Sequence, residues 1–312
     1  MKYKDNITGI LIVNKPQGPT SRDIVNKVQK ILNTKAGHTG TLDPLAKGVL
    51  VITLGKATKL SEIITAETKE YEAEAMFGIE TDTLDITGKV TKNDKTKISK
   101  EKIINALEKF KKTYNQEVPK YSAIKIDGKK LYEYARENID VKLPKKEVTI
   151  YDIKLLDYNE KENKIKFYTK VSKGTYIRSL IRDISYELNT IGVMSNLTRI
   201  AQGKFTIDNS YTLEDIKNGN YKIIPIKKVL NVKIKKVNDE LKQKILNGAI
   251  LLGNEDVLFI DKDGKELALY HSIKGQLKIW KMLYKKDWHF HENIILYLSR
   301  WNTWFLMKKR KN

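Results

Sequence analysis

The segment Gly37-His38-Thr39-Gly40-Thr41-Leu42-Asp43-Pro44-Leu45-Ala46-Lys47-Gly48-Val49-Leu50 decides the organisation of this chain of 312 residues. It reads as a loop rich in glycine and threonine that presents one carboxylate, Asp43, and then enters an apolar run. The proline that follows pushes Asp43 toward extended backbone geometry, and the glycines upstream let the backbone approach a ligand closely. On the residues alone Asp43 is a nucleophile, a base or an Asx-turn residue, and Asp before Pro is typical of turns.

Strands and amphipathic helices are predicted on both sides of this loop. Runs that are apolar or alternate in polarity predict strands at Gly9–Val13, Val49–Leu54, Tyr71–Phe77, Val148–Leu156 and Lys164–Val171. A first helix is capped by Thr20 or Ser21. A second follows Ser99, and a third begins at Thr175. The apolar residues predicted to face inward from the second helix are Ile103, Ile104, Leu107 and Phe110. The larger part of the chain is therefore predicted to be a mixed α and β domain.

The pattern changes near residue 230. A helix is predicted over Val237–Leu246, and Asn247-Gly248 is a typical C-cap. Short strands follow at Val257–Ile260, Glu266–Tyr270 and Leu277–Leu283. The sequence therefore predicts a small β domain over about 230–284.

The composition favours a polyanion as partner and excludes several kinds of site. The 59 Lys and Arg against 38 Asp and Glu give a net charge of +21, which points to nucleic acid, although part of such a charge is ordinarily solvated surface. The absence of cysteine excludes disulfides, a thiolate zinc site and a Cys nucleophile. No stretch approaches the roughly 20 apolar residues of a membrane span. The chain has four histidines, His38, His271, His289 and His291, and their spacing does not predict a metal-binding site.

The Asp43 loop resembles the signature of the TruB family of pseudouridine synthases, which isomerise uridine in RNA. Further segments resemble this family in the same order along the chain. They are Lys15-Pro16-x-Gly18-x-Thr20-Ser21, Lys69-Glu70-Tyr71-Glu72-Ala73, Tyr121-Ser122-Ala123-Ile124-Lys125, Ser172-Lys173-Gly174-Thr175-Tyr176-Ile177-Arg178 and Leu197-Thr198-Arg199. The resemblance covers residues 9–284.

This resemblance implies an α+β (mixed α/β) fold. A catalytic domain over 1–230, with a mixed and mainly antiparallel sheet, would carry an RNA-gripping insertion at about 92–140. A small PUA-like RNA-binding domain would occupy 231–284. Residues 285–312 form a basic and aromatic tail to which the resemblance assigns nothing.

The resemblance also implies roles for individual residues. Asp43 would be the catalytic nucleophile and Arg178 its ion-pair partner, while Tyr71 would stack on the flipped uracil and serve in removing the C5 proton. On the residues alone, Tyr71 reads as core and Arg178 as a phosphate contact or a surface charge. Whether Asp43 attacks C6 of the base, attacks C1′ of the ribose or abstracts a 2′ proton stays open.

Three further residues would complete the binding pocket. Tyr176 would form a second wall and Leu197 an apolar floor. His38 would contact the flipped nucleotide or take its place in the stack. Lys15 either holds the loop or touches phosphate, and is left outside the catalytic set.

We therefore expect an isomerase that converts uridine to pseudouridine at position 55 in the T-arm of tRNA. It would act as a cytoplasmic monomer with no cofactor, no metal and no membrane association. Two alternatives stay open. One is a guide-dependent synthase of the archaeal and eukaryotic type, and the other is a non-catalytic chaperone that binds tRNA by its shape.

Overall fold

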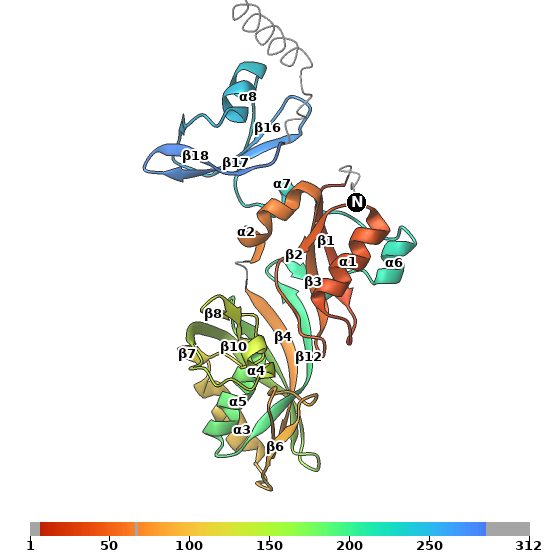
Figure 1. Cartoon of the computed structure of the whole chain (residues 1–312), viewed down its shortest axis with the longest axis vertical. Coiled ribbons are helices and arrows are strands. Elements are labelled where there is room, and N and C mark those ends of the chain that lie inside the picture. Colours follow the sequence, from red (N-terminus) through yellow and green to blue (C-terminus); the bar gives the residue numbers. More distant parts are fainter. Residues whose placement is uncertain (1–6, 66–67, 285–312) are drawn as a thin grey trace, which may run out of the picture. The chain divides into compact units, whose positions relative to one another are not determined.

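The computed structural model describes residues 7–65 and 68–284, and the chain divides between Asn231 and Val232 into two compact units. The tail 285–312, to which His289 and His291 belong, lies outside the described residues. Figure 1 labels most of the elements of both units. Each unit is described by itself below.

The first unit is built on one large sheet with helices packed against it. Its strands are β1 Gly9–Lys15, β2 Ala36–His38, β3 Lys47–Leu54, β4 Lys69–Phe77, β5 Ile79–Thr81, β6 Val90–Asn93, β7 Thr113–Glu117, β8 Lys125–Ile126, β9 Lys129–Lys130, β10 Lys145–Asn159, β11 Lys164–Val171, β12 Gly192–Gln202 and β13 Phe205–Thr206. Its helices are α1 Ser21–Leu32, α2 Ser61–Thr65, α3 Lys100–Lys109, α4 Leu131–Arg136, α5 Ile177–Glu187, α6 Leu213–Lys217 and α7 Ile226–Val229, with short 3-10 turns at η1 Gly55–Leu60 and η2 Ile207–Asn209.

The large sheet has nine strands, seven of them in the order β1-β3-β12-β4-β11-β10-β7, with β2 paired to β3 and β13 to β12. All of its pairs are antiparallel except β3 with β12. The predicted mixed, mainly antiparallel sheet is confirmed. Strand periodicity did not predict β12, the central strand between β3 and β4, because its alternation is interrupted by the buried polar residues Ser195, Arg199 and Gln202.

Two apolar clusters fasten the helices to this sheet. One joins α1 and α6 to β1 and β3, and the other joins α3 and α5 to β4, β10, β11 and β12. Figure 1 shows α3 and α5 beside each other. Ile103 and Leu107 of α3 are buried as predicted, but the prediction for Ile104 was wrong. Its position about 100° around the helix from Ile103 leaves it 42% exposed.

The helix ends follow local chemistry. Thr20 caps α1 through a capping box with Asp23, and Ser99 caps α3 through its side chain. Helix α5 begins at Ile177 rather than at Thr175, and its N-cap residue Tyr176 provides no side-chain cap. Among the described residues, none of the helices combines the length and the apolar character needed to cross a membrane.

The second unit is a five-stranded sheet with one helix. Its strands have the order β14-β16-β17-β18-β15, with bounds β14 Lys233–Lys236, β15 Leu251–Leu252, β16 Val257–Ile260, β17 Glu266–Ile273 and β18 Gln276–Met282. Helix α8 spans Asp239–Leu246 and is capped by the Asn238 side chain. Its residues Ile245 and Leu241 pack on a cluster that includes Phe259 and Tyr270.

The parallel contact between β3 and β12 depends on Gly48. This residue pairs with Arg199 across the sheet and adopts φ +101°, in the region that L side chains rarely occupy. A Cβ atom at Gly48 would lie 2.3 Å from the carbonyl oxygen of Arg199. The close approach therefore needs glycine both for the dihedral angle and for space.

We expect Gly48→Ala to lower the free energy of unfolding by about 3 kcal/mol, because backbone strain and a steric overlap add. Gly128→Ala is the matched control, since Gly128 has φ +83° with nothing within 4 Å of the added Cβ, and strain alone costs about 1 kcal/mol. Urea titration followed by far-ultraviolet circular dichroism measures both. Equal losses in the two variants would contradict the close-approach argument.

Candidate active site

The loop that carries Asp43 is held from within the protein by Lys15, at the end of β1. Lys15 is fully buried, and its Nζ donates to the carbonyl oxygens of Pro16 at 3.0 Å, Pro44 at 3.4 Å and Ala46 at 2.6 Å. Burial lowers the pKa of Lys15 to about 8, while the nearby Asp43 carboxylate acts in the opposite direction. Lys15 therefore binds the backbone of the loop directly after Asp43.

Arg199 holds the preceding part of the same loop from the central strand β12. Its side chain is also fully buried. Nε donates to the carbonyl of Val49 at 2.7 Å, Nη2 to that of Gly40 at 3.0 Å and Nη1 to that of Thr41 at 3.4 Å. A fork of fixed geometry thus spans the loop and the strand that follows it.

Neutral side chains fix the remaining loop residues. Ser21 Oγ donates to the carbonyl of Leu42 at 2.9 Å and accepts from its N–H at 2.8 Å. Gln202 Nε2 donates to Thr39 Oγ1 at 2.7 Å. The backbone on either side of Asp43 is therefore fixed, while the Asp43 side chain itself stays 38% exposed.

Arg178, in the first turn of α5, joins three segments. Its Nε lies 3.0 Å from Asp43 Oδ2. Its terminal nitrogens bind elsewhere: Nη1 donates to the carbonyl of Thr83 at 2.9 Å and Nη2 to that of Tyr121 at 3.0 Å. The guanidinium is buried, so the ion pair is orientated by the protein rather than by solvent.

A cavity of about 470 Å³ opens beside this ion pair. Five of the residues named from the sequence line it, and they are Asp43, Tyr71, Tyr176, Arg178 and Leu197. Tyr71 comes from β4 and Leu197 from the adjacent β12. Burial raises the pKa of the Tyr176 phenol, which keeps it neutral. Aromatic and apolar walls beside one carboxylate suit a flat, uncharged ring.

His38 does not line this cavity. It lies on β2, where its Nδ1 accepts the N–H of Gly40 at 3.3 Å. Burial lowers its pKa, and the charges of Arg199 and Arg22 lower it further, so the ring is neutral near pH 7. The structure places His38 against the backbone of the loop and the other five residues around one space.

The chemistry of the site is that of a single carboxylate. Asp43 can attack carbon or accept a proton, and Arg178 fixes its direction. In residues 7–65 and 68–284, no group of three or more His, Asp or Glu side chains is placed to hold a metal ion.

Sequence patterns missed the residues that hold the loop from within. Arg199 carried no assigned role, and Lys15 was left between two roles. The available signal was a charged residue in or at the end of a strand with apolar neighbours, since a charge enters a core only where it has partners. Those partners are backbone carbonyls, and side-chain patterns do not reveal them.

The fold and the site together describe a mixed α/β protein with one carboxylate, Asp43, ion-paired to Arg178 beside a cavity that has aromatic and apolar walls. Residues 28–177 match the family described as TruB family pseudouridylate synthase (N terminal domain). The chain is 42% identical to tRNA pseudouridine synthase B of Caldicellulosiruptor saccharolyticus, over 90% of this chain and 95% of that protein. It is also 42% identical to the protein of the same name from Bacillus pumilus, over 87% of this chain and 96% of that protein. The chain belongs to the TruB family of pseudouridylate synthases.

Solved structures agree with this family. A chain in the crystal structure of a Cbf5-Nop10-Gar1 complex superposes with a TM-score of 0.66 and 25% identity, over 90% of this chain and 86% of that one. The predicted α+β fold is confirmed, and the sheet of the second unit is consistent with the predicted PUA-like domain.

The buried ammonium of Lys15 makes stability depend on pH. Its pKa is lower in the folded state, about 8 against 10.5, so between these pH values the unfolded chain holds a proton that the folded chain has released. Raising the pH through this window should therefore stabilise the wild type relative to Lys15→Met, by up to about 3 kcal/mol at 1.36 kcal/mol per pKa unit. Below pH 8 the difference should be constant.

Urea unfolding of both proteins from pH 7 to pH 10 measures this difference. Lys30→Met is the control, because Lys30 is exposed on α1. A difference between wild type and Lys15→Met that stays flat, or that falls with pH, would contradict the burial of a charged Lys15.

Proposed function

We propose that this chain isomerises uridine 55 in the T-arm of tRNA to pseudouridine, with Asp43 as nucleophile. The observation that carries the proposal is the ion pair of Asp43 with Arg178 at 3.0 Å, beside a cavity lined by Tyr71 and Leu197. The names of the relatives support tRNA as the substrate. Their identity to this chain extends over most of its length.

The proposed reaction begins with extrusion of the target nucleotide, because a paired or stacked base cannot reach a pocket. The uracil ring then lies against Tyr71, with Leu197 beneath it. Asp43 acts on C6 of the base, on C1′ of the ribose, or as a base at C2′. The N1–C1′ bond breaks, the ring turns, and a C5–C1′ bond forms. The C5 proton leaves with the help of the Tyr71 hydroxyl, and N1 gains a proton, so the atoms balance without a cofactor.

The geometry of Arg178 supports this role for Asp43. Only Nε of the guanidinium pairs with the carboxylate, through Oδ2. Among the described residues Arg178 is the one cation paired with Asp43, which leaves Oδ1 for the substrate. Arg178 therefore holds the carboxylate through Oδ2, and Oδ1 is the oxygen that can react with the substrate.

The charge of the chain supports an RNA partner. The net charge is +21, and folded RNA is recognised largely through shape, phosphate and 2′-hydroxyl contacts. We infer that the insertion at 92–140 grips the T-arm and that the PUA-like unit, 231–284, binds the acceptor side. We also infer that a monomer suffices, and that the enzyme works in the cytoplasm with its tRNA.

We predict that Asp43→Asn abolishes pseudouridine formation and leaves tRNA binding within about twofold. The amide keeps the shape of the loop but is a poor nucleophile, and enzymes commonly lower barriers by about 8 kcal/mol or more. Single-turnover tritium release from tRNA labelled at uracil C5 measures the chemistry, and filter binding measures affinity. Asp152→Asn is the matched control, since Asp152 pairs with Lys111 and Lys154 on the sheet surface, away from the cavity.

Two outcomes would contradict this assignment. An Asp43→Asn protein that keeps a tenth of wild-type turnover would make Asp43 a turn residue. Loss of tRNA binding together with turnover would favour the chaperone alternative.

A second prediction concerns the substrate. We expect the protein alone to modify an unmodified tRNA transcript at position 55 and at no other uridine, because the site is complete within one unit of this chain. Mapping by carbodiimide labelling and primer extension locates the product, and a transcript with cytidine 55 is the control. A requirement for a guide RNA or an added protein would favour the guide-dependent alternative.

A further inference from the structure

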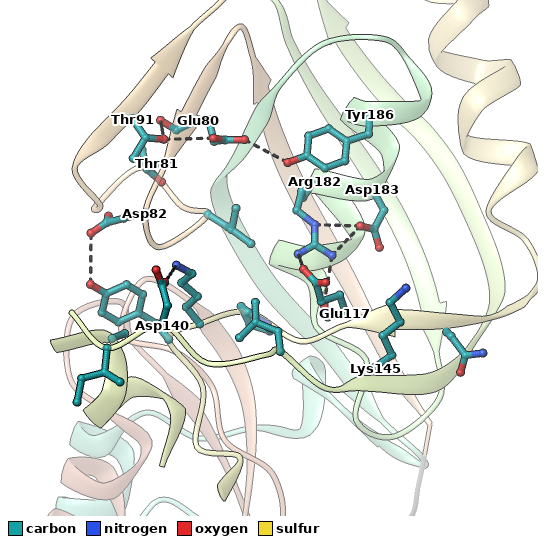
Figure 2. Close-up of a pocket in the computed structure, with 18 of the residues that line it drawn as sticks. Glu80, Thr81, Asp82, Thr91, Glu117, Asp140, Lys145, Arg182, Asp183 and Tyr186 are labelled. Carbon is teal, nitrogen blue, oxygen red and sulfur yellow. Dashed lines mark hydrogen bonds and ion pairs between the residues drawn. The ribbon is translucent and has the colours of Figure 1, made fainter. Parts of the chain in front are cut away.

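A second cavity, of about 860 Å³, is lined by residues of α5 and β7 and shares Tyr121 with the first. Figure 2 shows Arg182 at its wall, between the carboxylates of Asp183 and Glu117. Arg182 Nε and Nη2 lie 3.0 Å and 2.8 Å from Asp183 Oδ1, and Nη1 lies 3.2 Å from Glu117 Oε1. These contacts satisfy one oxygen of Asp183 and leave the other for a different partner.

That partner begins a chain of hydrogen bonds toward the active site. The Tyr114 hydroxyl donates to Asp183 Oδ2 at 3.1 Å, and Gln116 Nε2 donates to the Tyr114 oxygen at 2.9 Å. Gln116 Oε1 then accepts the backbone N–H of Tyr176 at 2.8 Å. Burial raises the pKa of Tyr114 and of Asp183. Tyr114 therefore keeps its proton, and Arg182 opposes the effect of burial on Asp183.

The count of protons fixes the direction of every bond in this chain. Asp183 receives donors at both oxygens, so the single Tyr114 proton points to it and the Tyr114 oxygen must accept. Gln116 therefore turns its NH₂ group toward Tyr114 and its oxygen toward Tyr176. Gln116 is 1% exposed, so water does not offer an alternative partner.

The end of this chain lies where the catalytic side chains leave α5. Tyr176 is the N-cap residue of α5 without a side-chain cap, and Arg178 lies in the first turn. Both line the cavity that holds Asp43. A shift of the Tyr176 backbone would move its ring and the Arg178 guanidinium together.

We infer that Gln116 is a positioning residue for the isomerisation, which fixes Tyr176 and Arg178 against Asp43 through its bond to the Tyr176 N–H. This inference rests on the proposed function. Gln116 touches no substrate, so its loss acts on turnover rather than on RNA affinity.

Gln116→Glu tests the inference through pH. A protonated carboxyl group at this position reproduces the amide, because its carbonyl accepts from Tyr176 and its hydroxyl donates to Tyr114. Once the introduced carboxyl group loses its proton, it still accepts from the Tyr176 N–H but no longer donates to Tyr114. The Tyr114 hydroxyl then faces two carboxylates, and their repulsion displaces the introduced side chain together with the Tyr176 backbone bound to it. The other charged groups on the elements around this position are Arg182 on α5, Glu117 on β7 and Lys146, the cross-strand partner of Gln116 on β10.

We expect kcat of Gln116→Glu to lie within about threefold of wild type at pH 6 and to fall at least tenfold relative to wild type by pH 8.5. KM and the tRNA Kd should not change. Gln116→Met should lose tenfold to a hundredfold in kcat at every pH. Gln29→Glu is the matched control, since Gln29 Oε1 also accepts a backbone N–H, that of Ala36, away from both cavities.

Steady-state kinetics, filter binding and thermal unfolding are measured on the same full-length proteins. A Gln116→Glu profile parallel to wild type, or an unchanged kcat in Gln116→Met, would overturn the inference. Parallel losses of kcat, tRNA affinity and melting temperature in Gln116→Met, without a pH effect in Gln116→Glu, would also overturn it and make Gln116 purely structural. If wild type forms no pseudouridine, the proposed function fails instead.

Discussion

Two fully buried cations, Lys15 and Arg199, hold the loop on which the whole site depends. Removing a charge from water is costly unless hydrogen bonds replace its hydration. Each of the two donates to three backbone carbonyls, most of them in the loop. The loop carbonyls bound by these cations therefore turn inward, and the loop presents the Asp43 carboxylate to the cavity beside Gly40, Thr41 and Leu42. The pKa of Lys15 is lowered because burial disfavours its charged form, so holding this cation inside the protein costs free energy.

Arg178 is a third buried cation with partners inside the protein, and it connects the loop to two neighbouring segments. Its Nε binds Asp43, while its terminal nitrogens bind carbonyls of Thr83 and Tyr121, which come from two other parts of the chain. The direction of the carboxylate thus depends on where those segments lie. Tyr121 lies in the segment that we propose grips RNA, so a ligand bound there has a direct physical route to the pair of Asp43 and Arg178. Preorganised charges of this kind need no rearrangement when the reaction occurs.

The sequence predicted those parts of the fold whose side chains alternate or repeat. The strands β4 and β11 and the helix α1 follow their apolar patterns closely. The central strand β12 did not, because Arg199 and Gln202 point into the core to bind a loop far away in the sequence. For the same reason Asp43 reads as a turn residue by itself: its partner Arg178 stands 135 positions later in the sequence. Hydrogen bonds from a side chain to backbone far away in the sequence produce no periodic pattern of polar and apolar residues.

The basic residues of this chain fall into a buried group and an exposed group. Lys15, Arg178 and Arg199 already have backbone or carboxylate partners, and each is buried. All three are thus engaged inside the protein rather than displayed on its surface. Exposed basic side chains, most of them lysines, are left to meet phosphate groups, and they belong to the excess of 59 basic over 38 acidic residues. Under the proposed function, affinity for RNA and the chemistry at Asp43 are therefore carried by separate sets of side chains. Salt then weakens RNA affinity by screening, while the contacts of the buried cations stay largely unscreened.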